Sequence, residues 1–150
     1  MENDMHRSKK RVASPKNSSP FFVVRQNNDL ETAEDYVELI SDLIQSKGEA
    51  RVCDIASGFG VSHVTVVRTL QRLQKKGYVT AQQRKPITLT NSGEKLAALS
   101  KSKHALLLEY LIFIGVPEEI AAVDAEGMEH HVSVETLEAF RNHLNLKTSQ

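Results

Sequence analysis

Two short amphipathic helical patterns, joined by a tight glycine turn, most strongly limit what this chain can fold into. The first pattern runs from Val52 to Phe59 and stops at the turn formed by residues 58–61. The second follows Ser62, a residue type favoured as a helix N-cap, and its apolar positions recur at three- and four-residue spacing up to Leu73. The sequence therefore predicts two short helices that meet across one turn.

A two-stranded hairpin is expected directly after this helix pair. Residues 78–81 and 87–90 alternate in a strand-like way, and the polar loop between them contains Arg84 and Lys85. The order helix, turn, helix, basic hairpin is that of a winged helix-turn-helix, whose second helix enters the major groove of DNA.

Basic side chains are concentrated in this segment. Residues 51–85 carry seven Lys or Arg against Asp54 alone, although the whole chain has no net charge. We predict that short polar or apolar side chains at the start of the second helix face the bases, and that basic ones hold phosphates. The candidates are Ser62, His63, Thr65, Val66 and Thr69 for bases, and Arg68, Arg72, Arg84 and Lys85 for phosphates. For Val66 the alternative is a position in the core. For the basic residues the alternative is an ordinary solvated surface.

The rest of the chain is predicted to be mainly α-helical. We expect a disordered basic tail over 1–28, a winged helix-turn-helix domain over 29–92 that opens with a helix from Thr32, and an all-helical domain over 93–150. A capping box at Asn91 and Glu94 should start a long helix that links the two halves. Two further helices are expected, one from Pro117 to His131 and one capped by Ser133.

Several classes of protein are excluded by what the sequence lacks. The single cysteine, Cys53, is expected to be buried and has no partner for an internal disulfide. There is no signal peptide and no run of 18 apolar residues, so we expect a soluble cytoplasmic protein with no membrane partner. No His-Glu-x-x-His motif or nucleophile elbow is present, so we expect neither an enzyme nor a small-molecule substrate.

Metal-binding residue types are dense in the segment 124–131. On a helix, the spacing of Glu126, Glu129 and His130 stacks all three on one face. This arrangement favours a metal site over solvated charges. His131 points about 100° away from its neighbour on a helix and is expected to support the site or the fold.

Two other predicted helices add donors to this set. Asp35 and Glu38 share one face of the first helix, and His104 lies in the middle of the long helix. Each residue has a simpler alternative. Asp35 could belong to a helix cap with Thr32, Glu38 could be a solvated charge, and His104 could be a surface histidine. Taken together, four carboxylates and two imidazoles form a hard donor set that suits Mn²⁺ or Fe²⁺.

Four segments carry a resemblance to a known family: residues 34–38, 60–62, 89–95 and 124–131. In order and spacing they resemble the manganese-responsive members of the diphtheria toxin repressor family, over residues 32 to 146. Of the four, the Glu-Gly-Met-Glu-His-His stretch within 124–131 is the most specific.

The resemblance implies a homodimer that binds palindromic double-stranded operator DNA and represses manganese uptake genes, with the metal as corepressor. It places the metal site between the two domains, around two adjacent Mn²⁺ ions. The ligands implied are Asp35, Glu38, His104, Glu126, Glu129 and His130. Iron-sensing relatives have Met in place of Asp35 and Cys in place of Glu126, which favours manganese here.

Alternative functions remain at this point. An Fe²⁺-responsive regulator of the same family accepts the same ligands, and a winged-helix regulator that senses an organic ligand needs none of them. A metal-dependent hydrolase would need a catalytic motif that the sequence does not contain.

Overall fold

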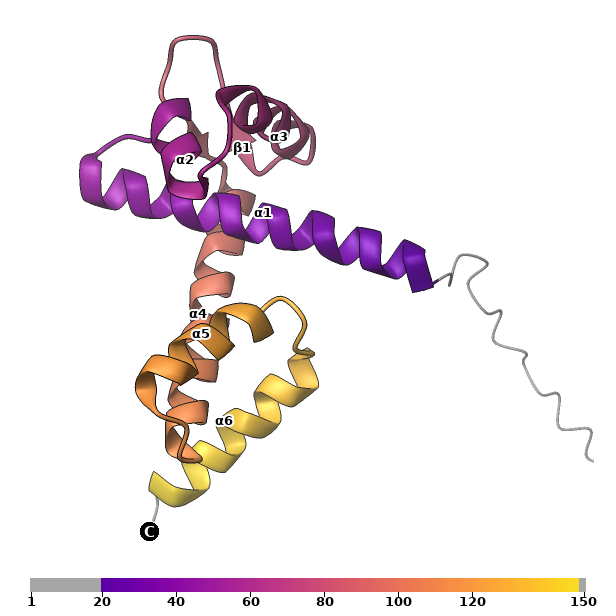
Figure 1. Cartoon of the computed structure of the whole chain (residues 1–150), viewed down its shortest axis with the longest axis vertical. Coiled ribbons are helices and arrows are strands. Elements are labelled where there is room, and N and C mark those ends of the chain that lie inside the picture. Colours follow the sequence, from indigo (N-terminus) through magenta and orange to yellow (C-terminus); the bar gives the residue numbers. More distant parts are fainter. Residues whose placement is uncertain (1–19, 149–150) are drawn as a thin grey trace, which may run out of the picture.

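The structure, a computed structural model, describes residues 20–148, with side chains given for 28–146. It consists of six helices and one small hairpin (Figure 1). In chain order these are α1 (Pro20–Lys47), α2 (Val52–Phe59), α3 (His63–Lys75), β1 (Val79–Thr80), β2 (Thr88–Leu89), α4 (Asn91–Phe113), α5 (Glu118–Met128) and α6 (Val134–Thr148). The prediction of a mainly α protein is confirmed, and no helix in the described range is long and apolar enough to span a bilayer.

Two hydrophobic cores are joined by α4, which runs from the upper half to the lower half (Figure 1). The first core is formed by α1, α2, α3, the hairpin and the start of α4, where Ala97 is buried. The second is formed by the later part of α4 together with α5 and α6, around the fully buried Leu107. The two cores therefore meet inside α4, between Ala97 and Leu106.

The turn between α2 and α3 has a backbone geometry that favours glycine. Gly60 has a φ of 64°, in the left-handed region that residues with a Cβ adopt at a cost. Ser62 then caps α3, as predicted, because its Oγ accepts a hydrogen bond of 3.2 Å from the backbone N–H of Thr65. This cap fixes the direction in which α3 leaves the turn.

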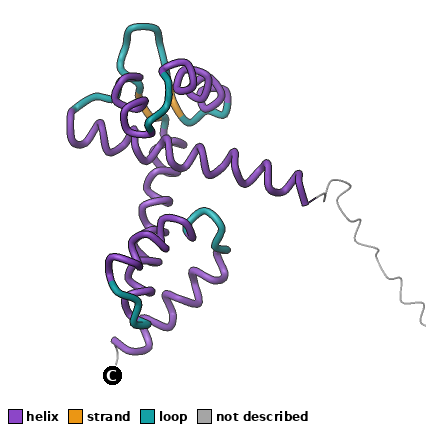
Figure 2. Tube along the Cα trace, viewed as in Figure 1, coloured by secondary structure: helices purple, strands orange, loops and turns teal. Residues whose placement is uncertain are grey.

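The hairpin is shorter than predicted and its loop projects from the molecule (Figure 2). Val79 pairs with Leu89 in an antiparallel register. The start of α4 packs directly on the residue before β1, since a Cβ at Gly93 would lie 2.0 Å from the carbonyl oxygen of Tyr78. Only glycine fits at that position.

Sequence patterns misplaced three helix ends. Helix α1 begins at Pro20, so residues 20–28 are helical rather than part of a disordered tail; residues 1–19 lie outside the described range. The cap of α4 is Thr90 rather than Asn91, because the Thr90 Oγ1 accepts from the N–H of Gly93 at 3.1 Å. Helix α5 ends at Met128 instead of His131.

Cys53 is also exposed, contrary to expectation. It lies in the first turn of α2, where Ile55 and Ala56 supply the buried face.

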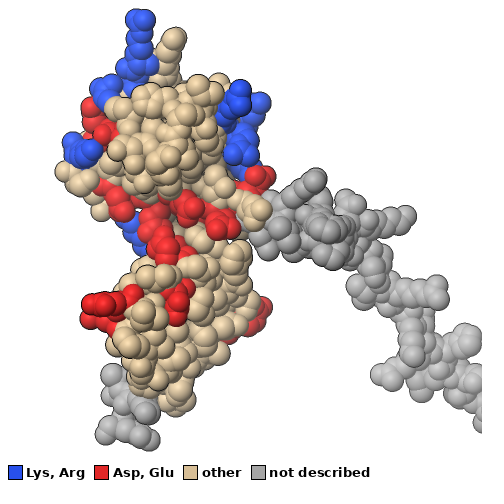
Figure 3. All heavy atoms as spheres, viewed as in Figure 1, with Lys and Arg blue, Asp and Glu red and all other residues tan. Residues whose placement is uncertain are grey.

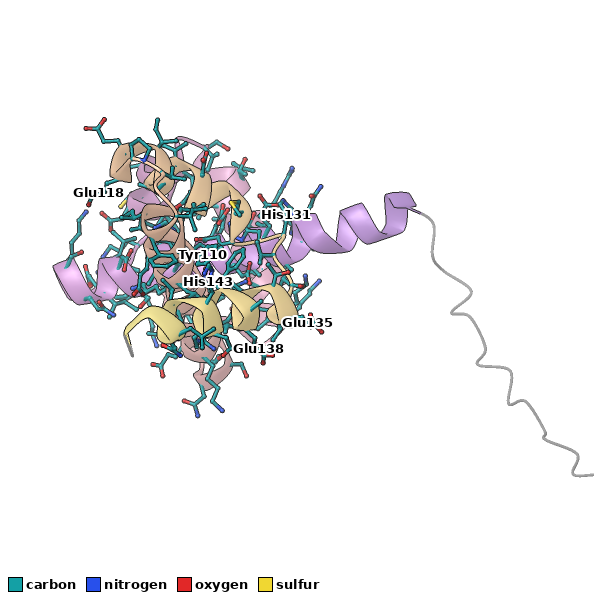
Figure 4. The ribbon with its side chains drawn as sticks, turned by 90° about the horizontal axis from the view of Figure 1, so that it is seen from below. Tyr110, Glu118, His131, Glu135, Glu138 and His143 are labelled. Atoms are coloured by element: carbon teal, nitrogen blue, oxygen red, sulfur yellow. The ribbon has the colours of Figure 1, made fainter. Side chains whose placement is uncertain are left out.

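In the lower half, α6 is held against α4 by aromatic packing. The rings of Tyr110 and Phe140 stack with centroids 4.0 Å apart. The Tyr110 hydroxyl lies 3.1 Å from Nδ1 of His143, and Figure 4 shows the two side chains together between these helices. Ser133 caps α6, as predicted, by accepting from the N–H of Thr136 at 3.2 Å.

Candidate metal centre

The predicted metal ligands meet where α1 crosses α4 and where α5 ends (Figure 1). Glu126 lies inside α5, whereas Glu129 and His130 follow its last residue. Glu129 keeps helical dihedral angles, φ −58° and ψ −31°, so the chain still turns in the sense of the helix. The helical direction of the chain is therefore retained at Glu129.

Three of the six predicted ligands form a compact group. Nδ1 of His104 lies 2.7 Å from Oε2 of Glu129 and 3.5 Å from Oε2 of Glu126. One donor atom from each of the three residues lies within 4.8 Å of the others. Donor atoms this close together can all reach one ion.

The other three predicted ligands adjoin this group. Nε2 of His130 lies 3.1 Å from Oδ1 of Asp35 and 3.6 Å from Oε1 of Glu129. Glu38 is connected through Ser100, whose hydroxyl donates to Oε2 of Glu38 at 2.8 Å and lies 3.5 Å from Oε1 of Glu129. The structure thus brings all six residues into one network.

Burial and mutual repulsion change the acid–base properties of this network. Burial raises the pKa of Glu129 and that of Asp35, and neighbouring carboxylates raise both further. For His130, burial lowers the pKa, but the hydrogen bond to Glu34 and the surrounding carboxylates outweigh burial, so the net shift is upward. A bound cation would stabilise this cluster of acidic groups, because its charge would offset their mutual repulsion.

The donor set fits a hard divalent metal ion. Its carboxylate oxygens and imidazole nitrogens are the ligands that Mn²⁺ and Fe²⁺ accept, and the group contains no thiolate or thioether. Glu129 is 2 % exposed and takes part in both sub-groups, with one oxygen toward His104 and the other toward His130. It therefore lies at the centre of the candidate site.

The second predicted site, the DNA-facing surface, stays a prediction, and the structure shows which of its residues are exposed. Seven of its nine residues are exposed: Ser62, His63, Thr65, Arg68, Arg72, Arg84 and Lys85. Val66 is fully buried and Thr69 is 5 % exposed, so both belong to the core beneath α3 and are withdrawn as base contacts. Figure 3 shows Lys and Arg on the outer part of the upper half and Asp and Glu gathered where the halves meet.

Comparison with known families accounts for both sites. Residues 30–87 match the iron dependent repressor N-terminal DNA binding domain, and residues 90–148 match the iron dependent repressor metal binding and dimerisation domain. The chain belongs to the iron-dependent repressor family. It is thus a metal-dependent transcriptional regulator, as the resemblance to the diphtheria toxin repressor family implied.

Similar proteins of this family are transcriptional regulators with the name MntR. The chain is 50% identical over 121 residues to the transcriptional regulator MntR of Escherichia coli O157:H7, covering 81% of this chain and 78% of that protein. It is 41% identical over 100 residues to the HTH-type transcriptional regulator MntR of Bacillus subtilis, with coverages of 67% and 70%.

A solved structure described as a manganese-dependent transcriptional repressor complex with manganese has a TM-score of 0.67 at 27% identity. The match covers 75% of this chain and 52% of that one, so the chain spans about half the length of that structure.

Sequence reasoning missed three residues that lie beside the predicted ligands. Glu34 and Lys103 form an ion pair beside the site, and Ser100 links two carboxylates. The spacing of Glu34 and Glu38, one helical turn apart, is a signal that could have found Glu34. His131 is exposed, with Nε2 4.0 Å from Glu31, and is labelled in Figure 4.

Proposed function

We propose that this protein is a Mn²⁺-dependent repressor of manganese uptake genes that binds palindromic operator DNA as a homodimer in the cytoplasm. Residues 29–92 read the DNA, and residues 93–150 complete the metal site and form the dimer. The metal is a corepressor, so uptake genes are turned off when manganese is plentiful.

The observation that carries this proposal is that the predicted ligands come from both halves of the molecule. Asp35 and Glu38 belong to α1, which packs in the core of the DNA-binding half. Glu126, Glu129 and His130 belong to the other half. A ligand set divided in this way couples metal binding to the relative placement of the two halves.

The residues of the chain then perform the regulatory step. Bound Mn²⁺ would supply positive charge that neutralises the carboxylates and joins them. Asp35 and Glu38 hold α1 toward α4, and α1 carries the core on which α3 rests. In a dimer, this fixes the separation of the two α3 helices, which must match the spacing of two operator half-sites.

The arrangement of the donors in two groups supports the binding of two ions per subunit. His104 and Glu126 lie on one side of Glu129, and His130 and Asp35 lie on the other. Six residues, of which Glu129 is shared, are more than a single ion requires if water keeps part of the coordination shell.

Manganese is preferred over iron because oxygen atoms occupy the positions that carry sulfur in iron-sensing relatives. Asp35 and Glu126 provide the oxygen ligands at those two positions. Fe²⁺ is the competing cofactor, since the whole donor set also accepts it.

Fluorescence anisotropy on a labelled uptake-gene promoter tests the proposal. The protein is titrated at fixed salt with Mn²⁺, with anaerobic Fe²⁺ and with chelator, because phosphate contacts depend on salt concentration. We expect tight binding with Mn²⁺ that chelator reverses, and weaker binding with Fe²⁺ at equal concentration. Operator binding that is indifferent to metal and chelator would overturn the proposal, and a stronger response to Fe²⁺ would reassign the metal.

A further inference from the structure

A carboxylate that belongs to neither predicted site lies directly behind the metal centre. Glu34 of α1 is 2 % exposed, although an unpaired buried carboxylate is costly. Its Oε2 lies 2.7 Å from Nδ1 of His130, and its Oε1 accepts from Nζ of Lys103 at 2.6 Å. Both oxygens are therefore occupied by protein groups.

The two histidines of the centre differ in what their ring nitrogens contact. Nδ1 of His104 faces Glu129 and Glu126, which are themselves predicted ligands. Nδ1 of His130 faces Glu34, while its Nε2 faces Asp35 and Glu129. For His130, one nitrogen is thus engaged outside the site and the other is directed into it.

We propose that Glu34, held by Lys103, is a positioning residue that fixes the tautomer and orientation of His130 for metal binding. This inference rests on the proposed metal-dependent function. Nδ1–H of His130 donates to the carboxylate, which leaves the lone pair on Nε2 directed at the metal-binding group. Glu34 itself does not bind the metal.

Lys103 gives Glu34 its second contact. Its ammonium group compensates the charge of the buried carboxylate, and its side chain is 15% exposed. Because Glu34 belongs to α1 and Lys103 to α4, the pair also holds these helices together beside the site.

The chain contains a matched control for this pair. Lys101 of α4 donates to Asp42 of α1 at 2.5 Å, so this second ion pair joins the same two helices. Its side chains are 35% and 57% exposed, and it contacts none of the predicted ligands. A variant of the control pair loses a link between α1 and α4 but leaves His130 undisturbed.

The test compares Glu34→Gln with Asp42→Asn in the full-length protein by calorimetric titration with Mn²⁺ alone. We expect Glu34→Gln to weaken Mn²⁺ binding about 10- to 100-fold, as is typical when a group supporting a ligand is changed. Asp42→Asn should stay within about twofold of the wild type, since an exposed ion pair contributes little. Circular dichroism and thermal melting establish that each variant is folded.

Nitrogen NMR of the imidazole rings provides a readout that a merely structural role would not move. In the metal-free wild type, His130 should carry its proton on Nδ1 whenever the ring is neutral. Glu34→Gln should change the ring nitrogen shifts of His130 and leave those of His143 unaltered. Lys103→Arg should preserve Mn²⁺ affinity, and Lys103→Met should reduce it, because only arginine keeps the charge beside Glu34.

The outcomes separate this inference from the proposed function. Failure of the wild type to bind Mn²⁺ would remove the function and the inference together. Wild-type binding with unchanged affinity and unchanged His130 signals in a folded Glu34→Gln variant would overturn the inference alone. Equal losses in Glu34→Gln and Asp42→Asn would also overturn it, since the effect would then be a general loosening of α1 from α4.

Discussion

The junction between the two halves and the surface around α3 both carry dense charge, but they hold it in opposite ways. At the junction, Glu34 and Glu129 are buried and paired with histidine or lysine. Around α3, Arg72 and Lys76 are exposed, and their contacts with Asp29 are 3.5 and 3.6 Å long. Buried, prearranged donors suit a small ion, whereas exposed basic side chains remain able to adjust to a large polyanion.

Specificity for a metal ion and specificity for DNA therefore arise in different ways. The candidate metal site depends on tertiary packing, because its predicted ligands come from α1, α4 and the end of α5. The predicted DNA-facing surface is local, since it consists of the exposed face of one helix and the hairpin loop. Substitutions at the two places should therefore differ in what they change, and the following experiments examine that contrast.

The largest effect is expected from loss of a ligand at the junction. Glu126→Ala should weaken Mn²⁺-dependent operator binding by about 100-fold or more, since ligand loss should exceed the effect of changing a supporting group. Its thermal stability without metal should be unchanged, because Glu126 is exposed. Anisotropy titration checks this result, and Glu119→Ala, an exposed carboxylate of the same helix, is the control. Unchanged metal dependence in Glu126→Ala would remove this residue from the site.

Within α3, Val66 and Val64 allow a buried and an exposed valine to be compared. Val66→Ala should lower the free energy of unfolding by about 2 kcal/mol, because two methyl groups leave a fully buried position. Val64→Ala should change it by less than about 0.5 kcal/mol, since Val64 is 60% exposed. Urea unfolding of both variants measures this, and equal destabilisation would contradict the assignment of Val66 to the core.

An exposed arginine of α3 should have a smaller and salt-dependent effect. Arg68→Ala should weaken binding to specific and unrelated DNA alike by about tenfold, and reduce the slope of log affinity against log salt by about one. The control is Arg141→Ala, an exposed arginine of α6 in the other half. An unchanged salt slope for Arg68→Ala would show that Arg68 does not contact phosphate.

The smallest effect concerns pH. The raised pKa values of Asp35, Glu129 and His130 mean that the metal-free site holds protons more tightly than isolated side chains do. Metal ligands must lose these protons, so Mn²⁺ affinity should rise with pH, by less than about tenfold between pH 7 and pH 8. Calorimetry in buffers of different ionisation enthalpy should also detect proton release. Affinity that falls as pH rises would contradict this electrostatic description.

The parts of the fold that depend on local signals could be predicted from the sequence. Apolar periodicity gave the helices, and the caps at Ser62 and Ser133 were placed correctly because a side-chain oxygen acts on N–H groups three residues away. The cap at Thr90 was missed because Asn91 and Glu94 present a competing pattern. In the structure the Thr90 Oγ1 accepts from the N–H of Gly93 and also donates to the carbonyl oxygen of Gly77.

The candidate ligands were predictable, but their supporting groups were not. Spacing alone brought together Glu126, Glu129 and His130. Ser100 and Lys103 carry no sequence signal, because their roles arise only when α4 packs against α1. The position of Val66 in α3 could not be predicted from the sequence either. Only its burial in the structure assigns it to the apolar face of the helix.

The most direct test of the central claim is to measure Mn²⁺ affinity with and without operator DNA. If the metal is a corepressor, linkage requires operator DNA to increase Mn²⁺ affinity by the same factor by which Mn²⁺ increases operator affinity. We expect equal factors, each well above one, and their loss in Glu126→Ala. The same Mn²⁺ affinity with and without operator DNA would contradict the coupling of the metal centre to the DNA-binding surface.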